Sequence, residues 1–327
     1  MNSIQQKTQA QISTDLTTTS PSVYIENAKA DNTKKAYTSD WNDFALWCSS
    51  NDVQALPASP ETVILYLIHL ADEKGFKAST IKRRITTISQ AHQAKEIEPP
   101  TQTYKVRMFL KGLKRAKSKT DKHFNIEQGK APVMLDQLKS MVDALPNNLL
   151  GIRDKAILLI GWAGARRRSE IVALDVDDLE WSENGLTLII RRSKTNQEGE
   201  VEKVSIWYGA NEATCPVRAL KRWLEEANIT VGAIFRGINR HGQISQKRLS
   251  DKSVALIVKR TAQAIGLNDS DFAGHSLRAG LATQSALSGL SERSIMKQTG
   301  HKSLEVLRRY IREGTAFNNN VTSKLGL

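Results

Sequence analysis

The sequence predicts a two-domain protein that is mostly α-helical and carries a small antiparallel β-sheet in its second domain. The chain has 327 residues, which is long for one ordinary domain and fits two. From about residue 21 to residue 117, apolar residues recur at the spacing of amphipathic helices. Further along, Leu186–Arg192 and Val201–Trp207 alternate like two strands joined by a polar turn, which indicates a hairpin.

The domain boundaries follow changes in composition along the chain. The first residues are rich in Thr, Gln and Ser and lack an apolar pattern, so we expect them to be flexible. A second polar stretch without periodicity contains Gly129 and Pro132, which is typical of a linker. The sequence therefore predicts a flexible N-terminus, a helical domain, a linker, a mixed domain and a tail at residues 1–20, 21–117, 118–132, 133–316 and 317–327.

The helical domain contains clear helix starts. Ser59 followed by Pro60 predicts one, because serine caps the first backbone amides and proline is favoured in the first turn. We expect Ser79 to cap the next helix, and a basic helix to cover about Tyr104–Ala116. The polar side of the helix after Ser79 carries Lys82, Arg83, Arg84, Thr87 and Gln90.

The second domain combines the hairpin with more helices. Ile152–Trp162 is apolar almost throughout, which predicts a buried helix. Helical spacing also predicts helices near residues 135–145, 216–227, 251–265, 277–287, 292–299 and 303–311.

The charge balance favours a polyanionic partner, most simply nucleic acid. Lys and Arg number 47 against 34 Asp and Glu, a net charge of +13. The only cysteines, Cys48 and Cys215, are too few for a disulfide framework or a cysteine-rich metal site. The chain has no apolar run of about 18 residues and no apolar centre of a secretory signal. We therefore expect no membrane partner and a cytoplasmic, nucleoid-associated protein.

Five segments of the second domain can carry chemistry when taken together. They are the run Arg166–Arg168 before Glu170, the turn lysine Lys194, the motif from His275 to Arg278, Gly300-His301, and Tyr310. Each one alone has an ordinary explanation, such as a surface basic patch, a solvated turn or a half-buried core tyrosine. Their order and spacing as a set are far more specific than any one of them.

The set resembles the tyrosine recombinase (phage integrase) family over roughly residues 22–315. That family carries an arginine, a hairpin lysine, His-x-x-Arg, Gly-His or Gly-Trp, and a tyrosine nine residues further on. The matching residues here are Arg167, Lys194, His275, Arg278, His301 and Tyr310. The plan is similar to the simple two-domain, Cre-like and Xer-like members.

One departure from the family pattern leaves a choice of arginine open. The family usually has Thr-Gly-Leu-Arg before x-Ser-Glu, whereas this chain has three consecutive arginines. Counting three residues back from Glu170 selects Arg167, which puts Ala165 where glycine is usual and Arg166 where an apolar residue is usual. A shift of one residue would select Arg166 or Arg168 instead.

The chemistry that the resemblance implies suits these residue types. A phosphodiester is an anion, and two guanidinium groups can neutralise the charge that builds on its non-bridging oxygens. A tyrosine hydroxyl has a pKa of about 10 and needs a base to become a nucleophile. We expect Tyr310 as the nucleophile, His275 as the proton acceptor, Lys194 as the general acid, Arg167, Arg278 and His301 as phosphate ligands, and Glu170 as an orienting residue.

The expected reaction is site-specific DNA cleavage and rejoining through a 3′-phosphotyrosyl intermediate and a Holliday junction, without ATP, metal or another cofactor. By resemblance the two domains form a C-shaped clamp on double-stranded DNA with an inverted-repeat site, as a dimer on one site and a homotetramer on two. We expect Thr87 and Gln90 to read base edges and basic residues to hold phosphates. The candidate DNA-binding residues are Lys82, Arg83, Arg84, Thr87, Gln90, Lys111, Arg115, Lys252, Lys259 and Arg260.

Other functions remain open at this point. A type IB topoisomerase-like strand transferase uses the same residue types without a specific site, a protelomerase-like resolvase is usually longer than this chain, and a non-catalytic DNA-binding relative would have lost the chemistry. The helical first domain and the hairpin favour a recombinase, and every catalytic position holds a competent residue.

Overall fold

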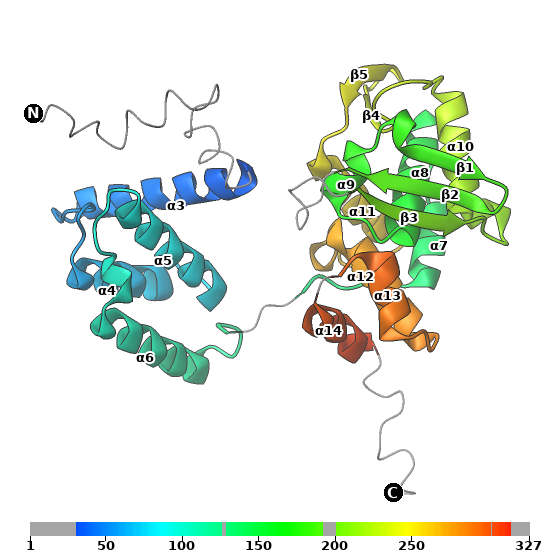
Figure 1. The fold of residues 1–327 in the computed structure, drawn as a ribbon. Coiled ribbons are helices and arrows are strands. Elements are labelled where there is room, and N and C mark those ends of the chain that lie inside the picture. The colour runs from blue at the N-terminus through cyan, green and yellow to red at the C-terminus, as the bar shows by residue number, and fades with distance from the viewer. Residues whose placement is uncertain (1–30, 126–128, 192–200, 302, 315–327) are drawn as a thin grey trace, which may run out of the picture. The chain divides into compact units, whose positions relative to one another are not determined.

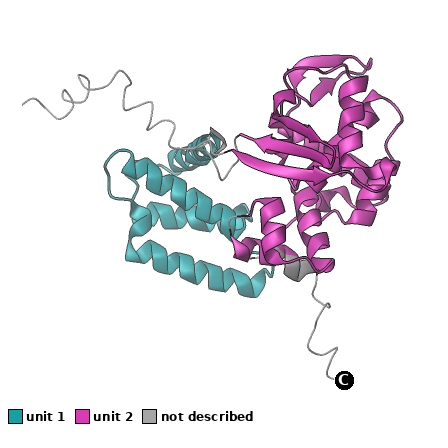
Figure 2. Cartoon of the chain, turned by 45° about the vertical axis from the view of Figure 1, so that its right-hand side comes forward, with its two compact units in different colours: residues 1–128 teal, residues 129–327 magenta. Residues whose placement is uncertain are grey.

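The computed structural model describes residues 31–125, 129–191, 201–301 and 303–314 (Figure 1). The chain divides into two compact units, residues 1–128 and 129–327 (Figure 2). This division falls inside the predicted linker, 118–132. Phe124 is buried in the core of the first unit, and the amide of Ala131 donates to Asp271 O in the second.

The first unit is all-helical, as the sequence predicts. Its elements are α3 (Asp31–Ser50), α4 (Pro60–Ile68), the π-helical turn η1 (His69–Glu73), α5 (Ala78–Gln93), the 3₁₀ turn η2 (Pro100–Gln102) and α6 (Tyr104–Thr120). Ser59 caps α4 by accepting from the amide of Thr62, as expected. The prediction that Ser79 caps α5 is wrong, because Lys77 has the extended backbone of a cap and Ser79 already lies inside the helix.

The core of the first unit forms where α3, α4 and α5 meet. Phe44 of α3 packs edge-on against the ring of Tyr66 from α4, with ring centroids 4.9 Å apart. His92 of α5 is fully buried and its Nε2 accepts from the amide of Ala58, which fixes the segment that leads into α4.

The second unit surrounds one long buried helix with small sheets and further helices. Its helices are α7 (Leu135–Asp143), α8 (Leu149–Ala163), α9 (Arg168–Ala173), α10 (Pro216–Glu226), α11 (Asp251–Ala264), α12 (His275–Leu287), α13 (Glu292–Thr299) and α14 (Leu304–Gly314). Helix α8 contributes Ile157, Leu158 and Ile160 to the core, which confirms the predicted buried helix.

The predicted hairpin is also confirmed. Strands β1 (Leu179–Ser182), β2 (Gly185–Ile190) and β3 (Glu202–Trp207) form an antiparallel sheet in that order. In the β2–β3 ladder Leu186 faces Ile206 and Leu188 faces Val204, so the apolar residues share one buried face. A second hairpin of β4 (Arg236–Ile238) and β5 (Ile244–Arg248) was not predicted from the sequence. None of the described helices is both long and apolar enough to cross a membrane.

The chain enters the second unit in close contact with α12. The indole Nε1 of Trp162 donates to Val133 O at 2.9 Å, and the amide of Val133 donates to Ser276 O at 3.0 Å. A Cβ atom added to Gly280 would lie only 1.9 Å from Val133 O, so this helix position requires glycine. Residues 131–133 are therefore fixed against the helix that begins at His275.

The turn between α8 and α9 has an unusual backbone conformation at Ala165. Its φ angle is +49°, in the left-handed region, where a Cβ atom costs about 1–2 kcal/mol. This is the position at which the family pattern has glycine, so the backbone there explains that preference.

We expect Ala165→Gly to stabilise the protein by about 0.5–1 kcal/mol, since relief of backbone strain outweighs the greater freedom of glycine in the unfolded chain. Urea unfolding measures the difference. Ala156→Gly, in the regular interior of α8, is the matched control and should destabilise by about 1 kcal/mol. A loss of stability in Ala165→Gly would contradict the strain argument.

Candidate active site

Tyr310 and His275 meet although they lie 35 residues apart in the sequence. The hydroxyl of Tyr310, on α14, is 2.5 Å from Nε2 of His275, at the start of α12. A small apolar cluster of Ala282, Ile295 and Leu307 packs α12, α13 and α14 together, and Tyr310 packs against it. The phenol is thus held beside an imidazole that can accept its proton.

His301 lies beside the same tyrosine. It follows Gly300, which ends α13 in the left-handed conformation at φ +66°, and its ring centroid is 5.7 Å from that of Tyr310. Its Nδ1 is 2.7 Å from the hydroxyl of Thr299. Burial and the nearby charge of Arg278 lower the pKa of His301 to about 3, so the ring is neutral at physiological pH.

Arg278 supplies a buried positive charge to the site. Only 1% of its surface is exposed, and its Nη1 donates to Ala165 O at 2.9 Å. Its Nη2 has no hydrogen-bond partner among the residues that the structure describes. Burial, followed by the repulsion of Arg167 and Arg166, lowers the pKa of Arg278 to about 10, which still leaves it charged at neutral pH. A buried guanidinium with a free N–H is suited to an anion.

Arg167 is held by Glu170 at the start of α9. Its Nη1 donates to Oε1 of Glu170 at 2.6 Å, and its backbone amide donates to Oε2 of the same carboxylate at 3.0 Å. Glu170 is buried, whereas 21% of the Arg167 side chain is exposed. The buried carboxylate of Glu170 thus orients the guanidinium of Arg167, part of which remains exposed to solvent.

The other two arginines of the run have separate partners. Arg166 is buried and donates to Oε1 of Glu202 at 3.0 Å and to Gln298 O at 2.8 Å, which connects strand β3 to the end of α13. Arg168 is half exposed and its Nε lies 3.0 Å from Oδ2 of Asp251 on α11. The contacts of Arg166 and Arg168 are those of structural residues, which favours Arg167 as the ligand of a substrate.

The structure therefore brings six of the seven predicted site residues to one place. They are Arg167, Glu170, His275, Arg278, His301 and Tyr310. The seventh, Lys194, lies outside the described residues. The sequence did not identify Arg166, Glu202 and Gln298 as supports of the site, although the unusual arginine at position 166 was a signal that a polar partner lies nearby.

This arrangement suits the attack of a phenol oxygen on an anion. Two arginines and the start of a helix concentrate positive charge here, and the charge of the buried Arg278 is screened less than in water. The imidazole of His275, which can accept a proton, lies next to the hydroxyl of Tyr310. No described group of three or more His, Cys, Asp or Glu residues is placed to hold a metal ion.

Two of the cations on the predicted DNA-facing side of α5 form ion pairs within the first unit. Arg83 pairs with Asp40 of α3, with Nη2 2.9 Å from Oδ1, but stays about half exposed. Arg84 is mostly buried, pairs with Asp43 and donates to the hydroxyl of Tyr66. The prediction of a DNA phosphate contact for Arg84 is therefore corrected to a structural role.

Thr87 also requires a correction. It is only 4% exposed, and its hydroxyl donates to Arg83 O at 3.3 Å, so it presents no surface to a base edge. Gln90, one turn further on, is partly exposed and remains a candidate.

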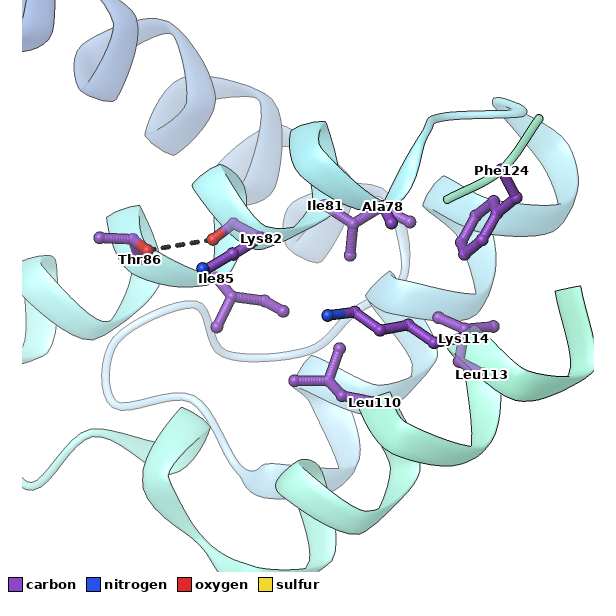
Figure 3. A pocket seen from close by; sticks show the side chains of 9 residues that line it. All are labelled: Ala78, Ile81, Lys82, Ile85, Thr86, Leu110, Leu113, Lys114 and Phe124. Atoms are coloured by element: carbon purple, nitrogen blue, oxygen red, sulfur yellow. Dashed lines mark hydrogen bonds between the residues drawn. The ribbon is translucent and has the colours of Figure 1, made fainter. Parts of the chain in front are cut away.

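Lys82 faces a different side of α5, along a groove between α5 and α6. Figure 3 shows Lys82 and Lys114 beside the apolar side chains of Ile85 and Leu110 that line this cavity of about 280 Å³. Lys111 and Arg115 are exposed on α6. Of the predicted DNA-binding cations of the first unit, Lys82, Lys111 and Arg115 are thus exposed on α5 and α6, whereas Arg83 and Arg84 form ion pairs with α3.

In the second unit the three candidates lie on α11. Lys252 is exposed in its first turn. Lys259 lies 3.6 Å from Asp269, and Arg260 is half exposed and pairs with the buried Asp154. Among these three cations, Lys252 alone forms no ion pair with an acidic residue that the structure describes.

Comparison with known proteins places these residues in a family context. The model of the Phage integrase family matches residues 133–316. The chain is 41% identical over 305 residues to an "Integrase/recombinase xerD homolog" of Selenomonas ruminantium, covering 92% of this chain and 87% of that protein. It is 24% identical over 301 residues to the "Recombinase cre" of Escherichia phage P1, covering 87% and 85%.

Solved structures are similar in fold. A Tn1549 transposon integrase in complex with transposon right end DNA matches with a TM-score of 0.59 at 14% identity, covering 88% of this chain and 92% of that one. A lambda integrase tetramer bound to a Holliday junction matches with a TM-score of 0.55 at 16% identity, covering 88% and 74%. At this identity the likeness shows the fold.

Proposed function

The chain belongs to the Phage integrase family, and we propose that Tyr310 is the nucleophile with which it cuts DNA. The protein is a tyrosine recombinase, an enzyme that cleaves and rejoins DNA strands in site-specific recombination. The observation that carries the assignment of Tyr310 is its hydroxyl, 2.5 Å from His275 Nε2, beside the buried guanidinium of Arg278.

In the proposed reaction the Tyr310 oxygen attacks the scissile phosphorus and displaces the 5′-oxygen of the next nucleotide. The phenol proton passes to Nε2 of His275, to which the hydroxyl is already bonded. The leaving 5′-oxygen takes a proton from Lys194, whose role rests on the family pattern. The DNA then carries a 3′-phosphotyrosyl ester. Because this ester conserves the energy of the broken bond, a second 5′-hydroxyl can reverse the step without ATP.

The cations of the site act on the non-bridging oxygens. In this proposal Arg278 donates through its free Nη2, and Arg167 donates through the part of its guanidinium that Glu170 leaves available. His301 is kept as the third ligand of the phosphate, a role that rests on the family pattern. Such preorganised donors stabilise the pentacovalent transition state more than the ground state, since the charge on those oxygens increases as the bond forms.

For DNA binding we propose a clamp of the two units on double-stranded DNA with an inverted-repeat site. A dimer would occupy one site and a homotetramer two, passing through a Holliday junction. The support is indirect: XerH, of similar fold at a TM-score of 0.54, is bound to a palindromic substrate, and lambda integrase is a tetramer on a Holliday junction. We place the enzyme in the cytoplasm, associated with the nucleoid where such DNA lies.

The phosphate contacts that we retain come from cations that are at least partly exposed. They are Lys82, Arg83, Lys111, Arg115, Lys252, Lys259 and Arg260, with Gln90 as a candidate for base contact.

A recombination assay tests the function. The site is first isolated by selecting bound duplexes from a random library, and two copies are then cloned into a supercoiled plasmid. We expect two product circles when the copies are in direct orientation, and an inverted segment when they are opposed. Relaxation of a plasmid without the site, with no recombinant product from either orientation, would favour the type IB topoisomerase-like alternative.

A further inference from the structure

Arg166 is a buried cation at a position where the family pattern has an apolar residue. Its guanidinium contacts three separate elements of the second unit. Nε donates to Gly164 O at the end of α8, Nη1 donates to Oε1 of Glu202 on β3, and Nη2 donates to Gln298 O on α13. The proposed mechanism uses none of these contacts.

Two carboxylates compensate the charge of this guanidinium. Its Nη1 lies 3.0 Å from Oε1 of Glu202 and 3.9 Å from Oε2 of Glu170. Burying a charge removes it from water, and a well-packed apolar side chain often stabilises a core as well as a buried ion pair does. Packing alone therefore does not explain an arginine at this position, and its directed polar contacts distinguish it from the usual residue.

The contact with Gln298 lies at the end of the helix that leads to His301. The last carbonyls of a helix have no partner within the helix, and a cation near them is favourable. Arg166 Nη2 donates to one of these carbonyls, Gln298 O, at 2.8 Å. The side chain of Gln298 adds to the connection, because its Nε2 donates to Ala163 O at 3.0 Å and to Ser205 O at 3.2 Å.

Glu202 contacts the same segment from strand β3. A Cβ atom added to Gly300 would lie only 2.5 Å from Oε1 of Glu202, so the carboxylate lies directly against the backbone that precedes His301. The same carboxylate oxygen accepts from Arg166. Arg166 and Glu202 together therefore hold the end of α13 and the residue that follows it.

The backbone around Arg166 supports the other two proposed phosphate ligands. Nη1 of Arg278 donates to Ala165 O at 2.9 Å, and Arg167 follows Arg166 directly in the chain. This one turn thus carries one arginine ligand and bonds the other, while the side chain of Arg166 reaches the segment that carries His301. The relative positions of the three ligands depend on it.

We propose that Arg166 is a positioning residue that fixes the segment carrying His301 relative to the two arginine ligands of the phosphate. Glu202 holds Arg166 in the orientation that this role requires. The inference rests on the proposed function, since it concerns ligands of the same phosphate. It accounts for the departure from the family pattern at position 166, where directed hydrogen bonds to α13 and β3 replace an apolar contact.

The kinetic test uses single-turnover cleavage of a nicked suicide duplex with saturating protein. Arg166→Met, which keeps an unbranched side chain but none of its donors, should slow cleavage by about 10- to 100-fold, since a misplacement of about 1 Å can cost about 100-fold. In a His301→Ala background the same substitution should have almost no further effect, because Arg166 acts through the position of that ring. Equal slowing in both backgrounds, or an unchanged rate in Arg166→Met, would overturn the inference.

The matched control is Arg153→Met, which removes another buried arginine of the second unit. Its side chain donates to Asp154 and to Arg236 O, and neither of these is a proposed catalytic residue. This variant should cleave at nearly the unsubstituted rate, and a defect as large as that of Arg166→Met would mean that the loss of any buried arginine has this effect and would overturn the inference.

Thermal unfolding shows whether Arg166→Met keeps the fold. If it does not, Arg166→Lys takes its place in the same comparison of backgrounds, with the same expected outcome. A single ammonium nitrogen retains the buried charge for Glu202 but cannot reproduce the three directed contacts of the guanidinium.

A second measurement identifies the ligand through which Arg166 acts. The scissile phosphate is replaced by each of its two methylphosphonate isomers, in which a methyl group takes the place of one non-bridging oxygen and the charge is lost. A missing ligand costs least on the isomer that lacks the oxygen it contacts. We expect Arg166→Met to show the same isomer preference as His301→Ala. A different preference, such as that of Arg167→Gln, would overturn the inference.

The two proposals fail in different ways. If the unsubstituted protein forms no covalent adduct with its site, the proposed function fails. If it forms the adduct and Arg166→Met cleaves at the same rate, only the role of Arg166 fails.

Discussion

Tyr310→Phe is expected to abolish the covalent protein–DNA adduct while DNA binding survives. The experiment uses a nicked suicide duplex, from which the short 5′-hydroxyl strand is lost after cleavage, so that the adduct accumulates and is seen after denaturation. The substitution removes only the attacking oxygen and its contact with His275 Nε2. Affinity should persist because phosphate contacts by cations dominate it, and these are unchanged.

The matched control is Tyr208→Phe, which removes a hydroxyl from a partly exposed tyrosine next to Arg218. It should form the adduct at the unsubstituted rate. An adduct in Tyr310→Phe would mean that another residue attacks the phosphorus, and a protein that no longer binds DNA would mean that the hydroxyl has a structural role.

Arg167→Gln should slow cleavage by about 100- to 1000-fold, since one preorganised donor to a developing oxyanion is worth about 2.7–4 kcal/mol. Glutamine keeps a polar side chain for Glu170 but removes the charge and the paired N–H groups. Single-turnover cleavage with saturating protein measures the effect apart from binding.

Arg168→Gln is the control within the same run of arginines. Its half-exposed pair with Asp251 is worth about 0–1 kcal/mol, and within the described part of the chain the side chain forms no ion pair with a predicted site residue. We expect a rate near that of the unsubstituted protein. The opposite order, with Arg168→Gln slow and Arg167→Gln fast, would show that the register of the motif is shifted by one.

Most of the fold could be predicted from periodicity, and the exceptions have physical causes. The buried helix α8 and the β2–β3 hairpin have long, regular apolar patterns, and both were confirmed. The β4–β5 hairpin was missed because Arg236–Ile238 is short and Ile244–Arg248 is largely polar and exposed, so neither alternates like a half-buried strand.

The site was predictable to the extent that it depends on spacing. The positions of His275, Arg278, His301 and Tyr310 follow the family pattern, and the structure brings them together. The choice among three adjacent arginines depends on which way each side chain points, which spacing does not encode.

The DNA-binding predictions for Arg84 and Thr87 failed for a related reason. They assumed that the polar face of a helix is exposed. Here Asp40 and Asp43 of α3, a helix distant in the sequence but adjacent in space, form ion pairs with that face and bury part of it. Such pairing between elements far apart in the sequence leaves no mark on the periodicity of either one.

The way the chain enters the second unit has a mechanical consequence. Val133 is bonded to α8 through the indole of Trp162 and to α12 through Ser276 O, and glycine at position 280 allows the backbone of Val133 to lie directly against α12. We therefore expect a displacement of Val133 to move the start of α12, which carries His275 and Arg278, because closely packed interiors transmit strain. A side chain at position 280 would push Val133 away from α12 and break this connection, although Gly280 itself contacts no proposed catalytic group.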